Sequence, residues 1–186
     1  IASLIFKTIR TSSIRPKQLI EGGRHGFLPV EYLEVRSDCV LIYPDPKSKK
    51  REARGPDLYI STDPEVIAGF AERIKGKSKK DPVFQFNVGD DLRTYSQNTY
   101  NYQIQKARKK IQKTDPNFRD IAGYALRHRA KDVLVQSGIS KDTRKAVMNH
   151  TEEGIQKEYG TRRLEAPVRE GVEVLARTWR ESLFSF

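Results

Sequence analysis

The spacing of apolar residues changes along the chain, and this change constrains the fold more than any other feature. Residues 30–60 contain short alternating or apolar runs at Tyr32–Arg36, Cys39–Tyr43 and Leu58–Ile60, with turn-forming residues between them. Such runs are typical of strands. On both sides of this region the apolar residues recur at helical intervals. The sequence therefore predicts a mostly α domain of the α+β class with a small three-stranded antiparallel sheet.

The positions of the helices follow from apolar spacing and from residues that favour helix ends. Pro16 suits a first helical turn, and Asp63-Pro64-Glu65 is a good helix start. Ser140 is a candidate N-cap, and Gly138 favours the end of a helix. The expected helices span residues 2–10, 15–20, 62–74, 94–113, 118–137, 140–149, 151–159 and 167–184.

The length of 186 residues fits one hydrophobic core, so we expect a single domain over residues 1–186. No apolar run approaches the ~18 residues of a membrane span, and the order of segments in a signal peptide is absent. The chain starts in a helix-like run and its single methionine is Met148, so we expect a fragment of a longer protein. The single cysteine, Cys39, excludes a disulfide framework within the chain and a cysteine-based zinc site. Its apolar neighbours predict a buried strand thiol, which favours a reducing, cytoplasmic location.

The charge predicts a polyanionic partner. Thirty-five Lys and Arg residues against 24 Asp and Glu residues give a formal net charge of +11, which is typical of nucleic-acid-binding domains. No Gly-rich phosphate loop is present, so a nucleotide-dependent enzyme is disfavoured. The basic residues cluster at 47–51, 75–80, 106–113 and 127–129.

Several segments, in a fixed order, carry the motifs of one enzyme family. They are Thr11-Ser12-Ser13-Ile14-Arg15-Pro16-Lys17-Gln18-Leu19, Tyr124-Ala125-Leu126-Arg127-His128, the apolar stretch 133–139 that ends in Gly138-Ile139, Val147-Met148-Asn149-His150, and Glu158-Tyr159. Their order and intervals resemble those of the tyrosine recombinase (phage integrase) catalytic domain. The resemblance covers most of the chain, because the small sheet and its basic hairpin also fall where that family has them.

The resemblance implies a role for each matching residue. Tyr159 would be the nucleophile, and Arg15 and Arg127 would clamp the phosphate. His150 would donate a hydrogen bond to the phosphate or assist proton transfer. Lys47 would be the general acid that protonates the leaving oxygen.

The chemistry explains these residue types. A phenol can attack a phosphodiester and later leave, so a 3′-phosphotyrosine intermediate conserves the bond energy. Arginine neutralises phosphate oxygens with a planar fork of donors that stays charged. A lysine whose pKa is lowered by neighbouring cations can donate a proton. The resemblance implies that no metal or organic cofactor is needed.

Each assignment has a structural alternative. Arg15 could be a surface helix residue, and Arg127 could pair with a nearby aspartate. His150 could be a helix C-cap, and Tyr159 could be a packing residue. Lys47 could belong to a solvated basic loop, and Lys49 or Lys50 could replace it as the general acid.

The sequence departs from the family pattern at three positions. Tyr124 replaces the histidine three residues before Arg127; a phenol can still donate to a phosphate, and this spacing puts both residues on one helix face. We therefore expect Tyr124 to be a site residue. Gln18 replaces an acidic residue, which would weaken the support of Arg15, and Asn149 replaces a glycine before His150.

The implied partner is double-stranded DNA. The resemblance implies a separate N-terminal DNA-binding domain outside this chain, a homotetramer on DNA and a bacterial, archaeal or viral mobile element. Six further basic residues are candidates for contact with DNA: Lys49, Lys50, Arg51, Lys79, Lys80 and Arg129.

Residues 164–186 form an apolar stripe on a predicted terminal helix. The stripe contains Val168, Val172, Leu175, Trp179, Leu183 and Phe184. It can pack on its own domain or, as the resemblance implies, dock on a neighbouring protomer.

The expected function is site-specific DNA recombination by strand cleavage and rejoining. A telomere resolvase and a type IB topoisomerase use the same chemistry and are alternatives. A non-catalytic DNA-binding module derived from an integrase is the alternative outside enzymes.

Overall fold

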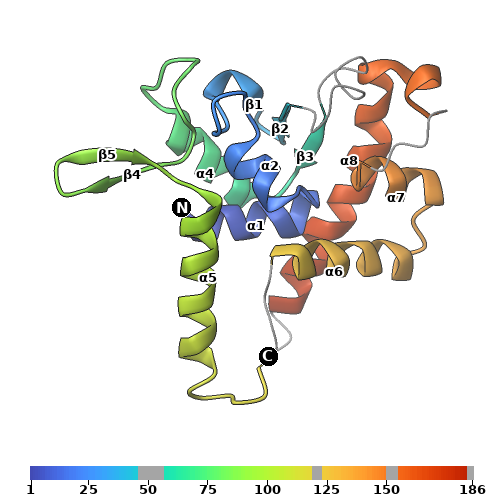
Figure 1. Ribbon diagram of the computed structural model, residues 1–186. Coiled ribbons are helices and arrows are strands. Elements are labelled where there is room, and N and C mark those ends of the chain that lie inside the picture. The colour runs from blue at the N-terminus through green and yellow to red at the C-terminus, as the bar shows by residue number, and fades with distance from the viewer. Residues whose placement is uncertain (46–56, 119–122, 150–154, 184–186) are drawn as a thin grey trace.

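The computed structural model describes residues 1–45, 57–118, 123–149 and 155–183; residues 123–124, 155–164 and 182–183 are described by their backbone alone (Figure 1). The described residues are mostly helical, with one three-stranded and one two-stranded sheet. The elements are α1 (Ala2–Ser12), α2 (Pro16–Glu21), η1 (Val30–Tyr32), β1 (Leu33–Val35), β2 (Val40–Ile42), β3 (Tyr59–Ser61), α4 (Pro64–Ile74), β4 (Gln85–Val88), β5 (Asp91–Thr94), α5 (Gln97–Ile111), α6 (Gly123–Gln136), α7 (Lys141–Val147) and α8 (Ile155–Leu183).

The predicted three-stranded antiparallel sheet is confirmed, with the order β1-β2-β3. Leu33 pairs with Ile42, which in turn pairs with Tyr59. The two-residue period of β2 buries both faces of the sheet: Val40 and Ile42 pack in one apolar cluster, and Leu41 packs in the other. The prediction that Cys39 is buried is also confirmed.

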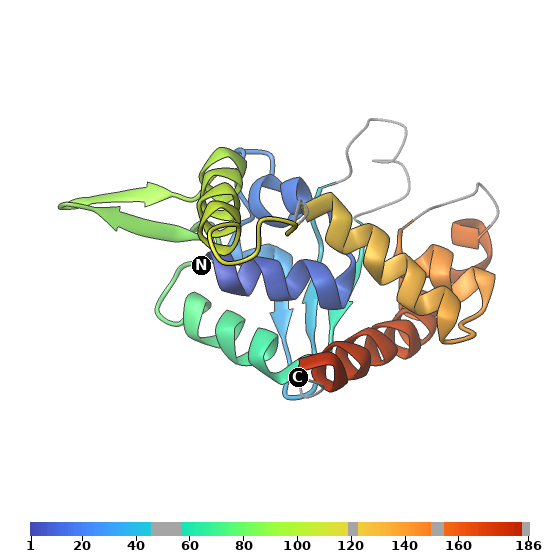
Figure 2. The ribbon, with the colours of Figure 1, turned by 90° about the horizontal axis from the view of Figure 1, so that it is seen from below.

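Helices cover both faces of this sheet. The first cluster contains Ile5 and Ile9 of α1 and Phe70 of α4, whereas the second contains Leu134 of α6 and Val172 of α8. In Figure 2, α4 lies toward β1 and α8 lies toward β3. The sheet is therefore the layer that separates two parts of the core.

Two predicted helix starts are confirmed by their caps. The Asp63 side chain accepts hydrogen bonds from the amides of Glu65 and Val66, and Ser140 accepts one from the amide of Thr143. These caps satisfy N–H groups that a helix leaves without intrahelical partners.

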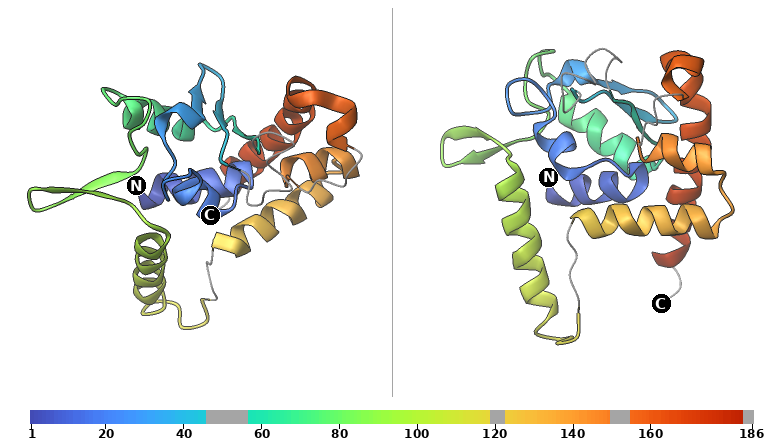
Figure 3. Two further views of the ribbon diagram at one scale, coloured as in Figure 1. Left: turned by 45° about the horizontal axis from the view of Figure 1, so that its top comes forward. Right: turned by 45° about the vertical axis from the view of Figure 1, so that its right-hand side comes forward.

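The β4–β5 hairpin was not expected from the sequence. It projects from the body of the domain, as does α5 (Figures 1 and 3). Leu92 is 62% exposed and Val88 is 42% exposed, so little apolar burial marks these strands in the sequence.

The prediction of separate helices at 151–159 and 167–184 is wrong, because α8 runs from Ile155 to Leu183 with Pro167 inside it. A proline inside a helix removes one backbone hydrogen bond and bends the axis, but it does not force the helix to end when the residues after it are well packed. Val168, Val172 and Leu175 are almost fully buried and supply that packing.

The described part of the apolar stripe packs on its own domain. Val172 and Leu175 lie in the core, and the Trp179 indole donates to the carbonyl of Arg10 at 3.1 Å. The Leu183 side chain and Phe184 lie outside the described residues. Docking on a neighbouring protomer stays a prediction.

Gly171→Ala should test the contact between α7 and α8. A Cβ at Gly171 would lie 2.5 Å from Cγ2 of Val147, in the buried core. We expect overpacking to cost about 1–3 kcal/mol, more than the ~1 kcal/mol that alanine gains in helix propensity. Urea denaturation measures the difference in the free energy of unfolding.

Gly69→Ala in α4 is the matched control. Its Cβ would lie 2.7 Å from Cδ1 of Leu4, the end of a half-buried side chain that can move aside. Gly69→Ala should therefore be neutral or stabilising. A Gly171→Ala variant as stable as the parent would contradict the close packing of α7 and α8.

Candidate active site

Arg127 of α6 is held at a junction of three helices. It is 4% exposed, and its guanidinium donates to the carbonyls of Ser13 and Met148. Ser13 ends α1 in a left-handed conformation with φ of 57°, and Met148 ends α7. A buried charge requires hydrogen-bonding partners, and these carbonyls fix the position of the guanidinium.

Arg15 lies at the N-cap of α2, close in sequence to Ser13. Its Nη1 donates to Oε1 of Gln18 at 3.2 Å and to the hydroxyl of Tyr59 at 3.4 Å. The side chain is half-buried, so it remains accessible to a ligand. Its position is set by α2 and by β3 together.

A chain of buried polar residues supports Arg15. The Tyr59 hydroxyl donates to Oε1 of Gln18 at 2.8 Å, and Nε2 of Gln18 donates to the Asp57 carboxylate at 2.6 Å. Gln18 therefore supports Arg15 through its amide oxygen. Asp57, one hydrogen bond further away, places a carboxylate behind Gln18.

Sequence reasoning missed Tyr59 and Asp57 as residues of this site. Tyr59 lies in an apolar strand, where an aromatic residue is expected to pack, so nothing in the sequence marked it. The one available signal was Asp57, a carboxylate directly before a buried strand; it is only 5% exposed.

Arg15 and Arg127 both lower the pKa of the Tyr59 hydroxyl. Burial is the main cause that raises the pKa of Tyr59 above its usual value. The positive charges of Arg127 and Arg15 oppose this rise, and the Asp57 carboxylate adds to it. Arg15 donates to the Tyr59 hydroxyl, and Arg127 donates to the carbonyl of Ser13, two residues before Arg15, so the two arginines lie in the same region of the structure.

Asn149 borders this cluster and directly precedes His150. It is 7% exposed and has a left-handed φ of 48°. Its amide lowers the pKa of Tyr59, although Nδ2 makes no well-aligned hydrogen bond with any described atom. Asparagine adopts this left-handed backbone conformation more readily than most residues do.

The other predicted catalytic residues fall partly outside the description. His150 and Lys47 lie outside the described residues, as do the competing lysines Lys49 and Lys50. Tyr124 lies in α6 and Tyr159 in α8, but only their backbone is described. Their roles stay predictions.

The predicted DNA-contacting residues Lys79, Lys80 and Arg129 are all exposed, whereas Arg51 lies outside the described residues.

Lys77, within the same basic segment as Lys79 and Lys80, differs from them because it is half-buried. Its ammonium donates to the carbonyls of Pro82 and Val83, and burial lowers its pKa. Lys77 therefore holds a turn together.

A second exposed basic surface lies on the projecting helix α5 and just after it. It consists of Lys106, Lys109, Lys110 and Lys113, with Arg108 half-buried among them.

Comparison with known proteins found no match to a family model, a curated protein or a solved structure. Among the described residues, no group of three or more His, Cys, Asp or Glu side chains could hold a metal ion. Within the same part of the chain, every helix is too short or too polar to span a membrane.

Tyr59→Phe should destabilise the protein by about 1–2 kcal/mol near neutral pH, because Gln18 loses a buried donor. The raised pKa of Tyr59 means that this stabilisation is present below the unfolded pKa of about 10 and is lost as the pH rises through the folded pKa. Urea denaturation from neutral to alkaline pH measures both effects.

The parent should therefore lose stability more steeply than Tyr59→Phe above about pH 10. Tyr102→Phe, on an exposed position of α5, is the control and should follow the parent. Identical alkaline slopes for the parent and Tyr59→Phe would contradict the buried position of this hydroxyl.

Proposed function

We propose that this chain is a tyrosine recombinase catalytic domain that cleaves and rejoins DNA through a 3′-phosphotyrosine at Tyr159. One observation carries the proposal: Arg127 donates to the carbonyl of Ser13, two residues before Arg15, so two arginines far apart in the sequence lie in the same region. These are the two arginines that the sequence motifs single out as the phosphate clamp.

Arg15 and Arg127 can stabilise the transition state in which a phosphodiester is cleaved. Charge builds on the two non-bridging oxygens when the phosphorus becomes five-coordinate, and two fixed guanidinium groups neutralise it without reorganisation. The carbonyls of Ser13 and Met148 orient Arg127, and Gln18 orients Arg15. Low solvent exposure around Arg127 strengthens its interaction with an anion.

The proposed reaction needs no cofactor. The Tyr159 oxygen attacks phosphorus as its phenolic proton passes to water, forming a P–O bond to tyrosine and breaking the bond to the 5′-oxygen of the next nucleotide. Lys47, or Lys49 or Lys50 in its place, donates a proton to that oxygen. His150 and Tyr124 donate hydrogen bonds to the phosphate, and rejoining reverses these steps.

The basic surfaces support DNA as the substrate. The exposed Lys79, Lys80 and Arg129 and the exposed lysines of α5 offer contacts to phosphates beyond the scissile one. Such contacts release counterions and position the duplex without reading its sequence. Assembly of a homotetramer on DNA belongs to the same proposal.

One observation favours a second candidate, a non-catalytic DNA-binding module. The hydrogen bonds of Arg127 to two backbone carbonyls would also suit an arginine whose role is to join helices. The experiments below separate this candidate from an enzyme.

Tyr159→Phe should abolish the covalent adduct with DNA, because only the nucleophilic oxygen is removed. DNA affinity should stay near that of the parent. The assay incubates each protein with a nicked suicide substrate and detects a protein–DNA band under denaturing conditions. Tyr102→Phe, which removes an exposed hydroxyl from α5, is the control and should retain the adduct.

An adduct at the parental level in Tyr159→Phe would exclude this residue as the nucleophile. A parent that binds DNA without any adduct would favour the non-catalytic module. For an active parent, the product distinguishes strand exchange between two sites from a hairpin made at one site or relaxation of supercoiled DNA.

Arg15→Lys should reduce cleavage by about 10²–10³-fold, because a lysine keeps the charge but loses the planar fork. Arg15 is half-buried, and its contacts with described residues are to the side chains of Gln18 and Tyr59, so the fold should survive. Single-turnover cleavage and DNA binding are measured together. Arg177→Lys, at an exposed position of α8, is the matched control and should cleave at the parental rate. Parental cleavage by Arg15→Lys would remove Arg15 from the clamp.

A further inference from the structure

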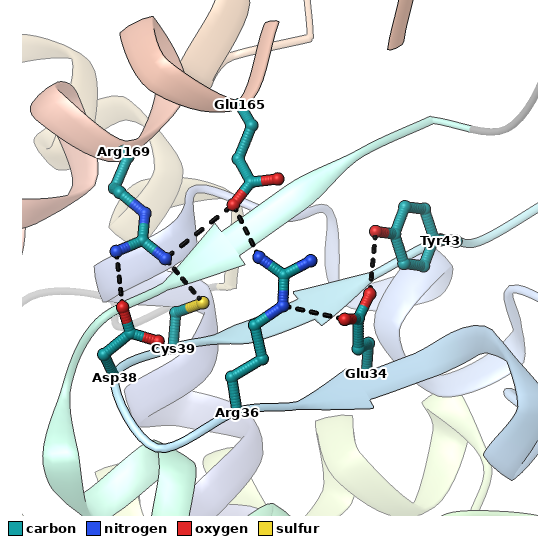
Figure 4. Close-up of polar contacts among 7 residues, drawn as sticks. All are labelled: Glu34, Arg36, Asp38, Cys39, Tyr43, Glu165 and Arg169. Atoms are coloured by element: carbon teal, nitrogen blue, oxygen red, sulfur yellow. Dashed lines mark hydrogen bonds and ion pairs between the residues drawn. The ribbon is translucent and has the colours of Figure 1, made fainter. Parts of the chain in front are cut away.

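An ion-pair network joins the β1–β2 turn to α8 (Figure 4). Nη1 of Arg36 donates to Oε1 of Glu165 at 2.7 Å, and Nη1 of Arg169 donates to Oδ2 of Asp38 at 2.6 Å. Glu165 also lies 3.7 Å from Nη2 of Arg169, one helical turn away. We call these four residues, Arg36, Asp38, Glu165 and Arg169, the latch.

Neighbouring side chains fix the latch in place. Nε of Arg36 donates to Glu34 on β1 at 2.7 Å, and Nη2 of Arg169 donates to Sγ of Cys39 at 3.1 Å. The hydrogen bond with Glu34 is the main cause that raises the pKa of Arg36, and the one with Arg169 lowers the pKa of Asp38. Arg36 therefore bonds to Glu34 and Glu165, and Arg169 bonds to Asp38 and Cys39.

Solvent exposure argues against a large role in global stability. The side chains of Arg36, Glu165 and Arg169 are 36%, 27% and 28% exposed. Ion pairs at such positions add little to the stability of a domain. Any role of the latch therefore depends on where it contacts α8 rather than on its contribution to the free energy of unfolding.

The latch contacts α8 at a weak point. Pro167 lies between Glu165 and Arg169 and has no N–H to bond with the carbonyl four residues earlier. After Pro167, α8 is anchored by buried residues such as Val172 and Leu175. Before Pro167, the same helix carries Tyr159.

We propose that the latch fixes the direction in which the N-terminal part of α8 leaves the core, and that Glu165 is thereby a positioning residue for Tyr159. This inference rests on the proposed function. Glu165 does not touch the reacting phosphate; it acts by keeping the segment of the proposed nucleophile aligned with the arginine pair.

The test compares Glu165→Gln, Arg36→Gln and the double variant with the parent. Glu165→Gln should slow single-turnover cleavage of the nicked substrate by about tenfold at saturating protein, because two ion pairs are lost beside Pro167. DNA affinity and the unfolding midpoint should stay near parental. Each single variant already loses the Arg36–Glu165 contact, so the double variant should be slower by less than the product of the two single effects.

Glu65→Gln is the matched control, because it removes an exposed ion pair with Lys7 that joins α1 and α4. It should cleave at the parental rate. Amide hydrogen exchange gives a readout independent of activity: in Glu165→Gln it should accelerate at residues 156–165 and stay parental at 168–179.

The outcomes separate the latch from the proposed function. A parent without any adduct would overturn the proposed function and, with it, the positioning role. An active parent beside a Glu165→Gln variant of parental rate would overturn the latch alone. Additive losses in the double variant, or a matching fall in the unfolding midpoint, would also overturn it, because either result indicates a general structural effect.

Discussion

The hydrogen bonds from the buried Arg127 guanidinium to the carbonyls of Ser13 and Met148 connect the parts of the molecule on which the proposed site depends. They join α6 to the ends of α1 and α7. Removing a buried cation from water is costly, so its partners must be fixed. Ser13 lies two residues before Arg15, so the contact that holds Arg127 is made next to the start of α2. The left-handed backbone of Ser13 turns the chain at this point.

The central sheet supplies the other half of the arrangement. Tyr59 and Ile60 are neighbours on β3, yet they belong to opposite core clusters because strand residues alternate between faces. Tyr59 thus reaches the α1–α2 side, where its hydroxyl meets Gln18 and Arg15. On the opposite face, α8 packs its residues after Pro167, while the latch joins the same helix to the β1–β2 turn. Among the described residues, helices and strands therefore hold Arg15, Arg127 and the four latch residues in place.

Local patterns predicted most of the fold because they report local physics. The three strands followed from short alternating runs, and the caps at Asp63 and Ser140 followed from side chains that satisfy helix N–H groups. The β4–β5 hairpin was not predicted, because exposed strands bury too little apolar surface for apolar and polar residues to alternate clearly along the sequence. The break expected near Pro167 was wrong because tertiary packing outweighs the local cost of one proline.

The sequence by itself determined the element types, the excess of positive charge and the two arginines within recognisable motifs. Only the tertiary structure decided that Arg127 reaches the carbonyl of Ser13 near Arg15, that Asp57 supports Arg15 through Gln18, and that Glu165 reaches Arg36 across 129 positions of sequence. The physical reason is that periodicity and capping involve neighbours along the chain. A contact between distant residues depends on how whole elements pack, and no short stretch of sequence encodes that packing.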